Sequence, residues 1–174
     1  MPSRSLIAVA AGVIGLVAIS ILMPPTPRLV WNVSESAPRG LYNVLPGSSP
    51  KPGDMVVAHM PAPVRRLAAV RHYLPGNVPL VKRVAAGAGQ QICAIGASVQ
   101  VDGRRVAVRR LADARGRTMP WWTGCVRLKD GQVLLLMDQS DSFDGRYFGP
   151  TSPPDVLGRA RLVWARPTRS PTDA

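Results

Sequence analysis

The stretch SVQVDGRRVAV, residues 98–108, shows most clearly which kind of secondary structure this chain forms. Valines recur at every second position on both sides of the dipeptide Asp102-Gly103. A period of two is typical of a strand with one buried face, and Asp-Gly favours the tight turn of a two-residue hairpin loop. The stretch therefore predicts two antiparallel strands joined at this turn.

The same pattern continues in both directions from this hairpin. Short apolar runs alternate with turn-forming residues, and helical periodicity is nearly absent. Further strands are predicted at residues 31–33, 55–59, 80–84, 133–137 and 161–164, and a loop or short helix at residues 65–73. The sequence predicts a mainly β fold, with one domain at residues 26–165 and a polar C-terminal tail at residues 166–174.

The N-terminal segment has a different composition. Residues 6–23 carry no charge, and Ser20 is their one polar side chain. As a helix they span about 27 Å, close to the roughly 30 Å hydrocarbon layer of a bilayer. A cleavable signal peptide has a similar length, but residues 20–23 lack its small-x-small cleavage pattern. We expect residues 1–25 to be an uncleaved anchor in membrane lipid, with an orientation that the flanking arginines do not fix.

Net charge and cysteine content indicate which partners and which compartment fit this protein. The formal net charge is +12, and 22 residues are basic. This charge can attract anionic lipid, nucleic acid or acidic substrates, or it can reflect codon usage. Because no basic run contains interleaved aromatics, we expect no nucleic-acid partner. Cys93 and Cys125 fit either two buried thiols or one disulfide, which forms readily outside the cytoplasm.

Lys82 is unusual because the chain carries nearly all its positive charge on arginine. Alternation along residues 80–84 places Leu80, Lys82 and Val84 on one face and Arg83 on the other. A buried lysine can lose its proton and act as a base, which arginine cannot. Lowering its pKa to near 7.4 costs on the order of 4 kcal/mol, which burial can supply. The alternative is a lysine that reaches solvent from a strand edge.

Two serines are candidate partners for this base. Ser34 and Ser36 lie two residues apart in a stretch predicted to be extended, so their hydroxyls share a face. A serine activated by a neutral lysine is a known form of nucleophile, and acyl transfer also needs donors for the developing oxyanion. The Ser36 N–H and the Ser34 hydroxyl are local candidates for these donors. A Ser-His-Asp arrangement with His59 or His72 is not excluded, although neither histidine has a supporting pattern.

Four blocks in order resemble a known peptidase group. They are NVSESAPRGLY (residues 32–42), PGDMVV (52–57), LVKRV (80–84) and SDSFDGRYFG (140–149). The first looks like the nucleophile motif of the conjugative-transfer signal peptidases called TraF, and the others resemble the signal peptidase I superfamily. Each block alone is a weak signal, but four in order behind an apolar anchor are specific.

The resemblance implies a Ser/Lys dyad, without a metal or cofactor, on an all-β catalytic domain. By motif position, Ser36 takes the role of nucleophile, Lys82 that of general base and Ser34 that of oxyanion donor. The implied location is the bacterial inner membrane, with the catalytic domain in the periplasm. The implied substrate is a pilin precursor, whose two ends enzymes of this type are associated with joining.

The last block offers two interpretations. Ser142, Asp144 and Arg146 alternate onto one side if the chain is extended there. In the functional interpretation, Ser142 hydrogen-bonds Lys82 to orient it, and Asp144 lies near the site, where it can hold an attacking amine. In the structural interpretation, Asp144 and Arg146 form an ion pair that stabilises the loop. The two interpretations are compatible.

Some positions depart from the general signal peptidase pattern. Ala37-Pro38 follow Ser36 directly, which is the TraF-type variant rather than the general one. Ala88-Gly89-Gln90 stand where the superfamily has Pro-Gly-Asp, and Gly145 stands where the last block usually has serine. Two rival functions remain: a general signal peptidase that removes leader peptides, against which Ala37-Pro38 argues, and a non-catalytic envelope scaffold. The pair Trp121-Trp122 either enters the lipid interface or packs into the core.

Overall fold

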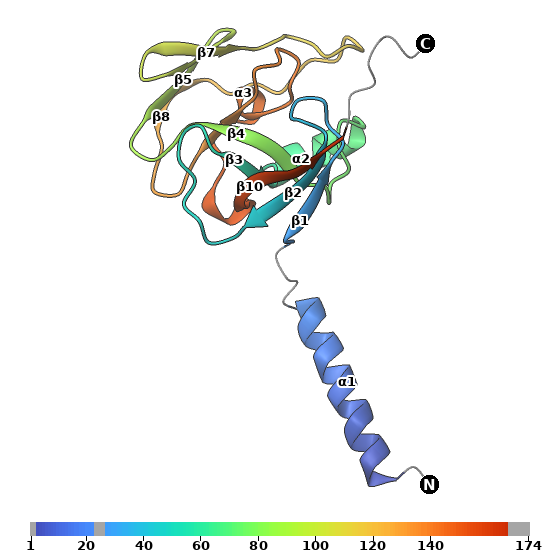
Figure 1. Cartoon of the computed structure of the whole chain (residues 1–174). Coiled ribbons are helices and arrows are strands. Elements are labelled where there is room, and N and C mark those ends of the chain that lie inside the picture. The colour runs from blue at the N-terminus through green and yellow to red at the C-terminus, as the bar shows by residue number, and fades with distance from the viewer. Residues whose placement is uncertain (1–2, 23–26, 167–174) are drawn as a thin grey trace.

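A computed structural model of the chain describes residues 3–22 and 27–166. Helix α1, Arg4–Leu22, extends away from the body of the molecule (Figure 1). It is the one helix of the described residues that is long and apolar enough to cross a membrane, and none of it is buried. A signal sequence meets the same criteria. The last three residues of the predicted anchor, 23–25, and nearly all of the predicted tail lie outside the described residues.

Ten strands form two antiparallel sheets (Figure 1). The larger sheet has the order β1-β2-β10-β3-β4-β9. Its strands are β1 Leu29–Asn32, β2 Gly40–Leu45, β3 Met55–Ala58, β4 Leu80–Ala86, β9 Leu134–Leu136 and β10 Val156–Ala165. Buried apolar side chains form three core clusters, to which both this sheet and the smaller sheet described next contribute. The prediction of a mainly β fold is confirmed.

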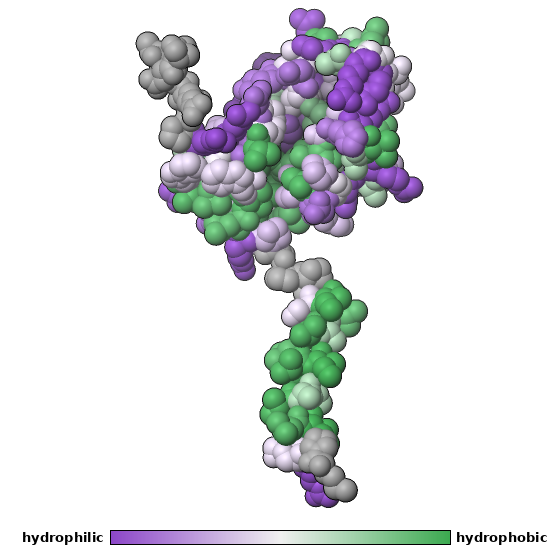
Figure 2. Space-filling model, turned by 90° about the vertical axis from the view of Figure 1, so that its right-hand side faces the viewer, coloured by the Kyte–Doolittle hydropathy of each residue, from purple (hydrophilic) through white to green (hydrophobic). Residues whose placement is uncertain are grey.

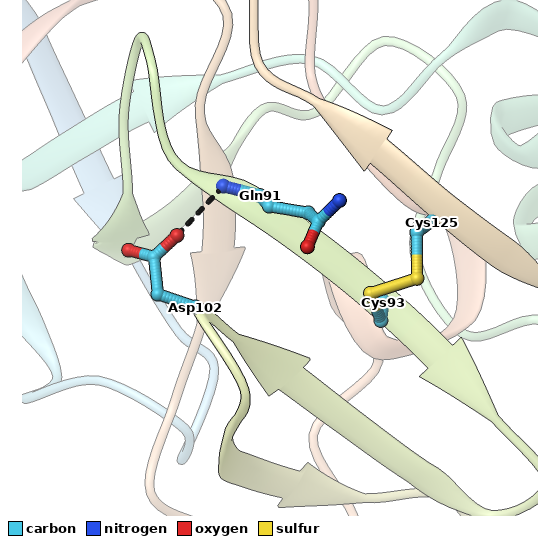
Figure 3. The surroundings of a disulfide bond; sticks show 4 residues. All are labelled: Gln91, Cys93, Asp102 and Cys125. Carbon is cyan, nitrogen blue, oxygen red and sulfur yellow. Dashed lines mark hydrogen bonds between the residues drawn. A yellow bond between two sulfur atoms is a disulfide. The ribbon is translucent and has the colours of Figure 1, made fainter.

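The smaller sheet has the order β7-β6-β5-β8. Its strands are β5 Gln91–Ile95, β6 Ser98–Val101, β7 Arg104–Val108 and β8 Gly124–Arg127. The hairpin β6–β7 is the one predicted, and Asp102 and Gly103 have the positive φ values, 47° and 79°, that its tight turn requires. The Gln91 N–H donates to the Asp102 carboxylate over 2.9 Å, which ties this turn to β5 (Figure 3).

A disulfide joins the smaller sheet across neighbouring strands. Cys93 on β5 lies directly opposite Cys125 on β8, and their sulfurs are bonded (Figure 3). Of the two arrangements open from the sequence, the disulfide is therefore the one formed. A closed loop with a sequence separation of 32 stabilises a domain by roughly 3–4 kcal/mol in the chain-entropy account.

Helices other than α1 are short. They are α2 Ala62–Val70, α3 Gly145–Phe148 and the 3-10 turn η1 Pro153–Asp155. The short helix predicted at residues 65–73 begins earlier and ends at Val70. The Asp144 side chain caps α3 by accepting from the Arg146 N–H, so Arg146 is helical and the extended conformation on which the alternation depended does not continue past Asp144.

Several strands were not predicted. These are β2, β5 and β8. The predicted strand at residues 161–164 is part of β10, which is longer than those four residues. All four residues of β8 are exposed and show no alternation, so periodicity could not reveal it. β2 begins at Gly40, where a Cβ atom would lie 2.0 Å from the Trp164 carbonyl oxygen of β10. Glycine at this position permits the close approach of β10.

Trp121 and Trp122 have different surroundings. Trp122 packs against the core cluster that contains Ile92 and Leu134, and its Nε1 donates to the Gly145 carbonyl over 3.2 Å. Trp121 is 38% exposed, with the guanidinium of Arg109 lying 3.7 Å from the centre of one of its rings. The core interpretation is therefore correct for Trp122.

Apolar surface gathers at the end of the domain nearest α1 (Figure 2). The edge strand β1 exposes Leu29 and Trp31, and β10 exposes Val163 and Trp164. Trp31 and Trp164 stack with their ring centroids 5.5 Å apart. Exposed tryptophans of this kind are common where a protein meets the headgroup layer of a membrane.

Candidate active site

Lys82 lies in the middle of β4, between β3 and β9 in the larger sheet. Its side chain is 3% exposed, whereas its neighbour Arg83 is exposed and pairs with Asp138. The predicted division of these two residues between the faces of the strand is confirmed. Lysine is rarely buried without a partner, so its surroundings identify the site.

Ser34 and Ser36 lie in the loop between β1 and β2. The loop turns at Glu35 and Ser36, so the extended conformation expected from the sequence is wrong. The hydroxyls nevertheless meet, with the two Oγ atoms 2.9 Å apart. The Ser36 N–H also points to the Ser34 Oγ over 3.3 Å. Both candidate oxyanion donors are therefore side by side.

Asn32, at the end of β1, fixes the shape of this turn. Its Nδ2 lies 3.1 Å from three carbonyl oxygens, those of Ser34, Ala37 and Pro38. Its Oδ1 accepts from the Ser34 N–H, also at 3.1 Å. The amide is 7% exposed, so solvent competes little with these bonds. Sequence reasoning assigned Asn32 no role, although it begins the first motif block.

The three side chains that the sequence placed around the reaction come together. Lys82 Nζ donates to Ser36 Oγ over 2.7 Å and to Ser142 Oγ over 2.8 Å. Ser36 and Lys82 are 46 residues apart in the chain, and Lys82 and Ser142 are 60 apart. A candidate nucleophile, a candidate base and a third group that orients the base are thus within hydrogen-bond reach.

Burial lowers the pKa of Lys82 from its ordinary value of 10.5 to about 8. The negative charges of Asp144 and Asp141 oppose this effect, and the positive charge of Arg146 adds to it. A pKa near 8 leaves a substantial fraction of the side chain uncharged at neutral to slightly alkaline pH. An uncharged lysine can take a proton from a serine hydroxyl.

Asp144 is fully buried and forms an ion pair with Arg146. One carboxylate oxygen accepts from Arg146 Nε over 2.8 Å, and the other accepts from the Met137 N–H over 3.0 Å. The Arg146 guanidinium also donates to the carbonyls of Met137 and Ser140. The pair therefore holds the loop that carries Ser142, as the structural interpretation expected, and offers no exposed carboxylate to an amine.

Gly145 follows this carboxylate in a crowded position. A Cβ atom there would lie 2.7 Å from the Leu135 carbonyl oxygen and 2.9 Å from the Leu134 side chain. The departure from the usual serine at this position thus fits close packing of α3 against β9.

A cavity of about 690 Å³ opens beside the two serines. Ser34, Ser36, Lys82 and Ser142 line it, together with apolar residues of β1 and of the segment that leads into β4. Neither His59 nor His72 lines it, so the Ser-His-Asp alternative is not supported. Within residues 3–22 and 27–166, no cluster of three or more His, Cys, Asp or Glu side chains is placed to hold a metal ion.

Comparisons with known proteins place the chain in a peptidase family. The model of the family described as signal peptidase, peptidase S26, matches residues 3–165. A probable conjugal transfer protein TraF of Sinorhizobium fredii is 35% identical over 86% of this chain and 87% of its own length. A conjugal transfer protein TraF of Agrobacterium fabrum is 32% identical over 76% of this chain and 80% of its own.

A signal peptidase I of Enterococcus faecalis aligns in three dimensions with a TM-score of 0.37 and 17% identity, over 64% of this chain and 97% of that one. The match to the family model spans all four motif blocks. Peptidases of this family act on exported proteins, which fits an apolar N-terminal helix. This chain belongs to the signal peptidase family, peptidase S26.

Proposed function

We propose that this protein is a membrane-anchored serine endopeptidase in which Ser36 is the nucleophile and Lys82 the general base. The observation that carries this proposal is the 2.7 Å contact between Ser36 Oγ and the Nζ of a lysine that is 3% exposed. A lysine kept only for charge would gain nothing from burial, which costs free energy whenever the amine is protonated.

Acylation begins with uncharged Lys82. Its Nζ takes the proton of Ser36 as the oxygen attacks the scissile carbonyl, and the same proton then passes to the leaving amine. Ser142 accepts a hydrogen bond from Nζ and keeps its lone pair directed at Ser36. The buried Asp144–Arg146 pair holds Ser142 in place, and we assign Asp144 this structural role rather than contact with an amine.

Ser34 supplies a donor for the oxyanion in this proposal. Its hydroxyl lies 2.9 Å from the Ser36 Oγ and accepts a hydrogen bond from the Ser36 N–H. When a carbonyl oxygen enters, both can turn to it, and the negative charge that develops is stabilised where water is excluded. Asn32 fixes the turn and so keeps these donors in place.

We infer that residues 1–25 anchor the enzyme in the bacterial inner membrane and that residues 26–165 form the catalytic domain in the periplasm. The disulfide supports this location, because such bonds persist in oxidising compartments. The exposed Trp31–Trp164 stack supports contact of the domain with lipid beside the anchor. A cleavage site in a membrane-associated substrate is then within reach of the cavity.

The proposed substrate is a pilin precursor used in conjugative transfer. Two relatives that match most of this chain are named for conjugal transfer, and Ala37-Pro38 directly after Ser36 is the variant that resembles them. In this proposal the Ser36 ester is resolved by the N-terminal amine of the same pilin, which gives a cyclic product. An amine held in position has an effective concentration far above that of water, at about 55 M.

Incubation of the pilin precursor with membranes that contain each variant tests the proposal. Wild-type protein should release mature pilin, and Ser36→Ala should release none while remaining folded and membrane-bound. Lys82→Arg should also be inactive, because arginine stays protonated. The matched control is Lys129→Arg, which changes an exposed lysine and should be fully active. Turnover by Ser36→Ala would refute the dyad, and equal cleavage of unrelated exported precursors would favour a general signal peptidase.

A further inference from the structure

Asp141 is an exposed acidic residue on the wall of the catalytic cavity. It directly precedes Ser142, whose hydroxyl contacts Lys82, and it lines the same cavity as Ser34, Ser36 and Lys82. Its charge also raises the pKa of Lys82, which means that the two side chains are within electrostatic reach. The proposed roles of Ser34, Ser36, Lys82 and Ser142 make no use of it.

Among the residues that the structure describes, most acids of this arginine-rich chain form an ion pair with arginine, whereas Asp141 does not. Six form ion pairs with arginine: Glu35, Asp54, Asp113, Asp138, Asp144 and Asp155. In the part of the chain that the structure describes, no ion pair engages the Asp141 carboxylate. Arg110 lines the same cavity but donates to Ser140 Oγ over 3.0 Å.

The other acidic residues that line the cavity already contact partners within the protein. Glu35 contacts Arg39, and the Asp113 carboxylate accepts from the Tyr73 hydroxyl and from Arg117. Asp141 is therefore the cavity carboxylate that remains available to a cation from outside. In a protein with a net charge of +12, such a group creates a local site where an ammonium ion is favoured.

We propose that Asp141 binds the amino group of the acceptor that resolves the Ser36 acyl-enzyme. The inference rests on the proposed function and names the residue that selects amine over water. The chemical class of the ligand is a primary ammonium at the N-terminus of a peptide. Asp144, the candidate from sequence, cannot fill this role because it is fully buried in its ion pair.

The chemistry balances with the groups present. The ammonium is held by the carboxylate, loses one proton to solvent and stays hydrogen-bonded to Asp141 through its remaining N–H groups. Its nitrogen attacks the ester carbonyl while Lys82 Nζ takes a second proton from it. The new C–N bond forms, the C–Oγ bond to Ser36 breaks, and Lys82 returns the proton to Ser36 Oγ. The products are an amide and the free hydroxyl of Ser36.

A small activated ester allows this step to be measured without the pilin. Full-length enzyme in detergent is acylated with acetyl-Ala-Ala p-nitrophenyl ester, and release of nitrophenolate reports acylation. Ser36→Ala gives the background rate. Glycyl-glycinamide is added as an amine that is mostly protonated at about pH 7, and hydroxylamine as a nucleophile that is uncharged there. Mass spectrometry gives the ratio of ligated to hydrolysed product for each.

The variants are chosen to separate binding of the cation from other effects. Asp141→Asn removes the charge at nearly constant shape, and Asp141→Glu restores it. Asp138→Asn is the matched control, since this acid lies three positions earlier, pairs with exposed Arg83 and does not line the cavity. Any change in the pKa of Lys82 affects hydrolysis and aminolysis alike and therefore cancels in the product ratio.

We expect Asp141→Asn to lower the ligation ratio with glycyl-glycinamide roughly tenfold, the loss of about one charge-assisted hydrogen bond. The hydroxylamine ratio should stay the same, Asp141→Glu should recover part of the loss, and Asp138→Asn should match wild type. An unchanged glycyl-glycinamide ratio in Asp141→Asn overturns the inference, as does an equal fall with both nucleophiles. Wild-type enzyme that acylates but gives only hydrolysis also overturns it and leaves the Ser36/Lys82 peptidase intact.

Discussion

Replacing Lys82 with methionine should make the folded domain more stable at neutral pH, and the gain should disappear at alkaline pH. Methionine fills a similar volume without a charge, so it removes the cost of burying an ammonium group. The pKa of Lys82 is lowered by burial from 10.5 to about 8 in the folded chain. Each unit of pKa difference between the folded and unfolded chain corresponds to roughly 1.4 kcal/mol.

The direction in which stability changes with pH follows from the number of protons that the folded and unfolded chains bind. Because the pKa is lower in the folded chain, the unfolded chain binds more protons between about pH 8 and 10.5, and wild-type stability rises with pH across that window. The cost of the charge is therefore fully present below about pH 8 and is mostly gone near pH 10.5, where the side chain is neutral in both states. It amounts to about 3 kcal/mol.

Lys82→Met also loses the hydrogen bonds to Ser36 and Ser142, which changes its unfolding free energy by an amount that is nearly constant with pH. The informative quantity is thus the difference in unfolding free energy between Lys82→Met and wild type, which should fall by about 3 kcal/mol from about pH 6.5 to 10.5. Guanidinium titrations of full-length protein in neutral detergent, followed by tryptophan fluorescence without reductant, give this difference. Groups that titrate in both proteins cancel.

Lys129→Met is the control, because this lysine is exposed and its replacement should give a difference that does not change with pH. If the Lys82→Met difference changes by less than about 1 kcal/mol over the same range, Lys82 keeps an ordinary pKa and is solvated. The general-base assignment would then lose its physical basis.

Three further predictions concern the site and the smaller sheet. The value of kcat/KM should rise with pH through a limb near 8, the pKa to which burial lowers Lys82, and a limb near 10.5 would contradict burial of the base. Ser34→Ala should reduce kcat about 10²–10³-fold without moving that limb, and a variant as active as wild type would remove Ser34 from the oxyanion site. Replacing Cys93 and Cys125 with serine should lower the unfolding free energy by roughly 3–4 kcal/mol in denaturant titrations, and unchanged stability would show that the disulfide is not formed in solution.

Local pattern in the sequence predicted those features that depend on neighbouring residues. The hairpin at Asp102-Gly103 follows from turn chemistry and a period of two, both of which act over a few residues. The apolar N-terminal helix follows from composition alone. Lys82 stood out because alternation placed a chargeable group on an apolar face, and the structure buries it on that face. The exposed strand β8 shows no alternation of apolar and polar residues, and it was not predicted. The turn at Glu35 and Ser36 was predicted to be extended.

The tertiary structure decided which distant groups meet. Ser36 and Ser142 approach Lys82 from positions 46 and 60 residues away, and a sequence carries no distances between such segments. The same holds for the disulfide, which needed β5 and β8 to pair in register. It also holds for the two acids of the last block: packing of α3 on β9 buries Asp144 against Arg146 and leaves Asp141 on the cavity wall. Burial and partners set the chemistry of a carboxylate, and both arise only when the chain has folded.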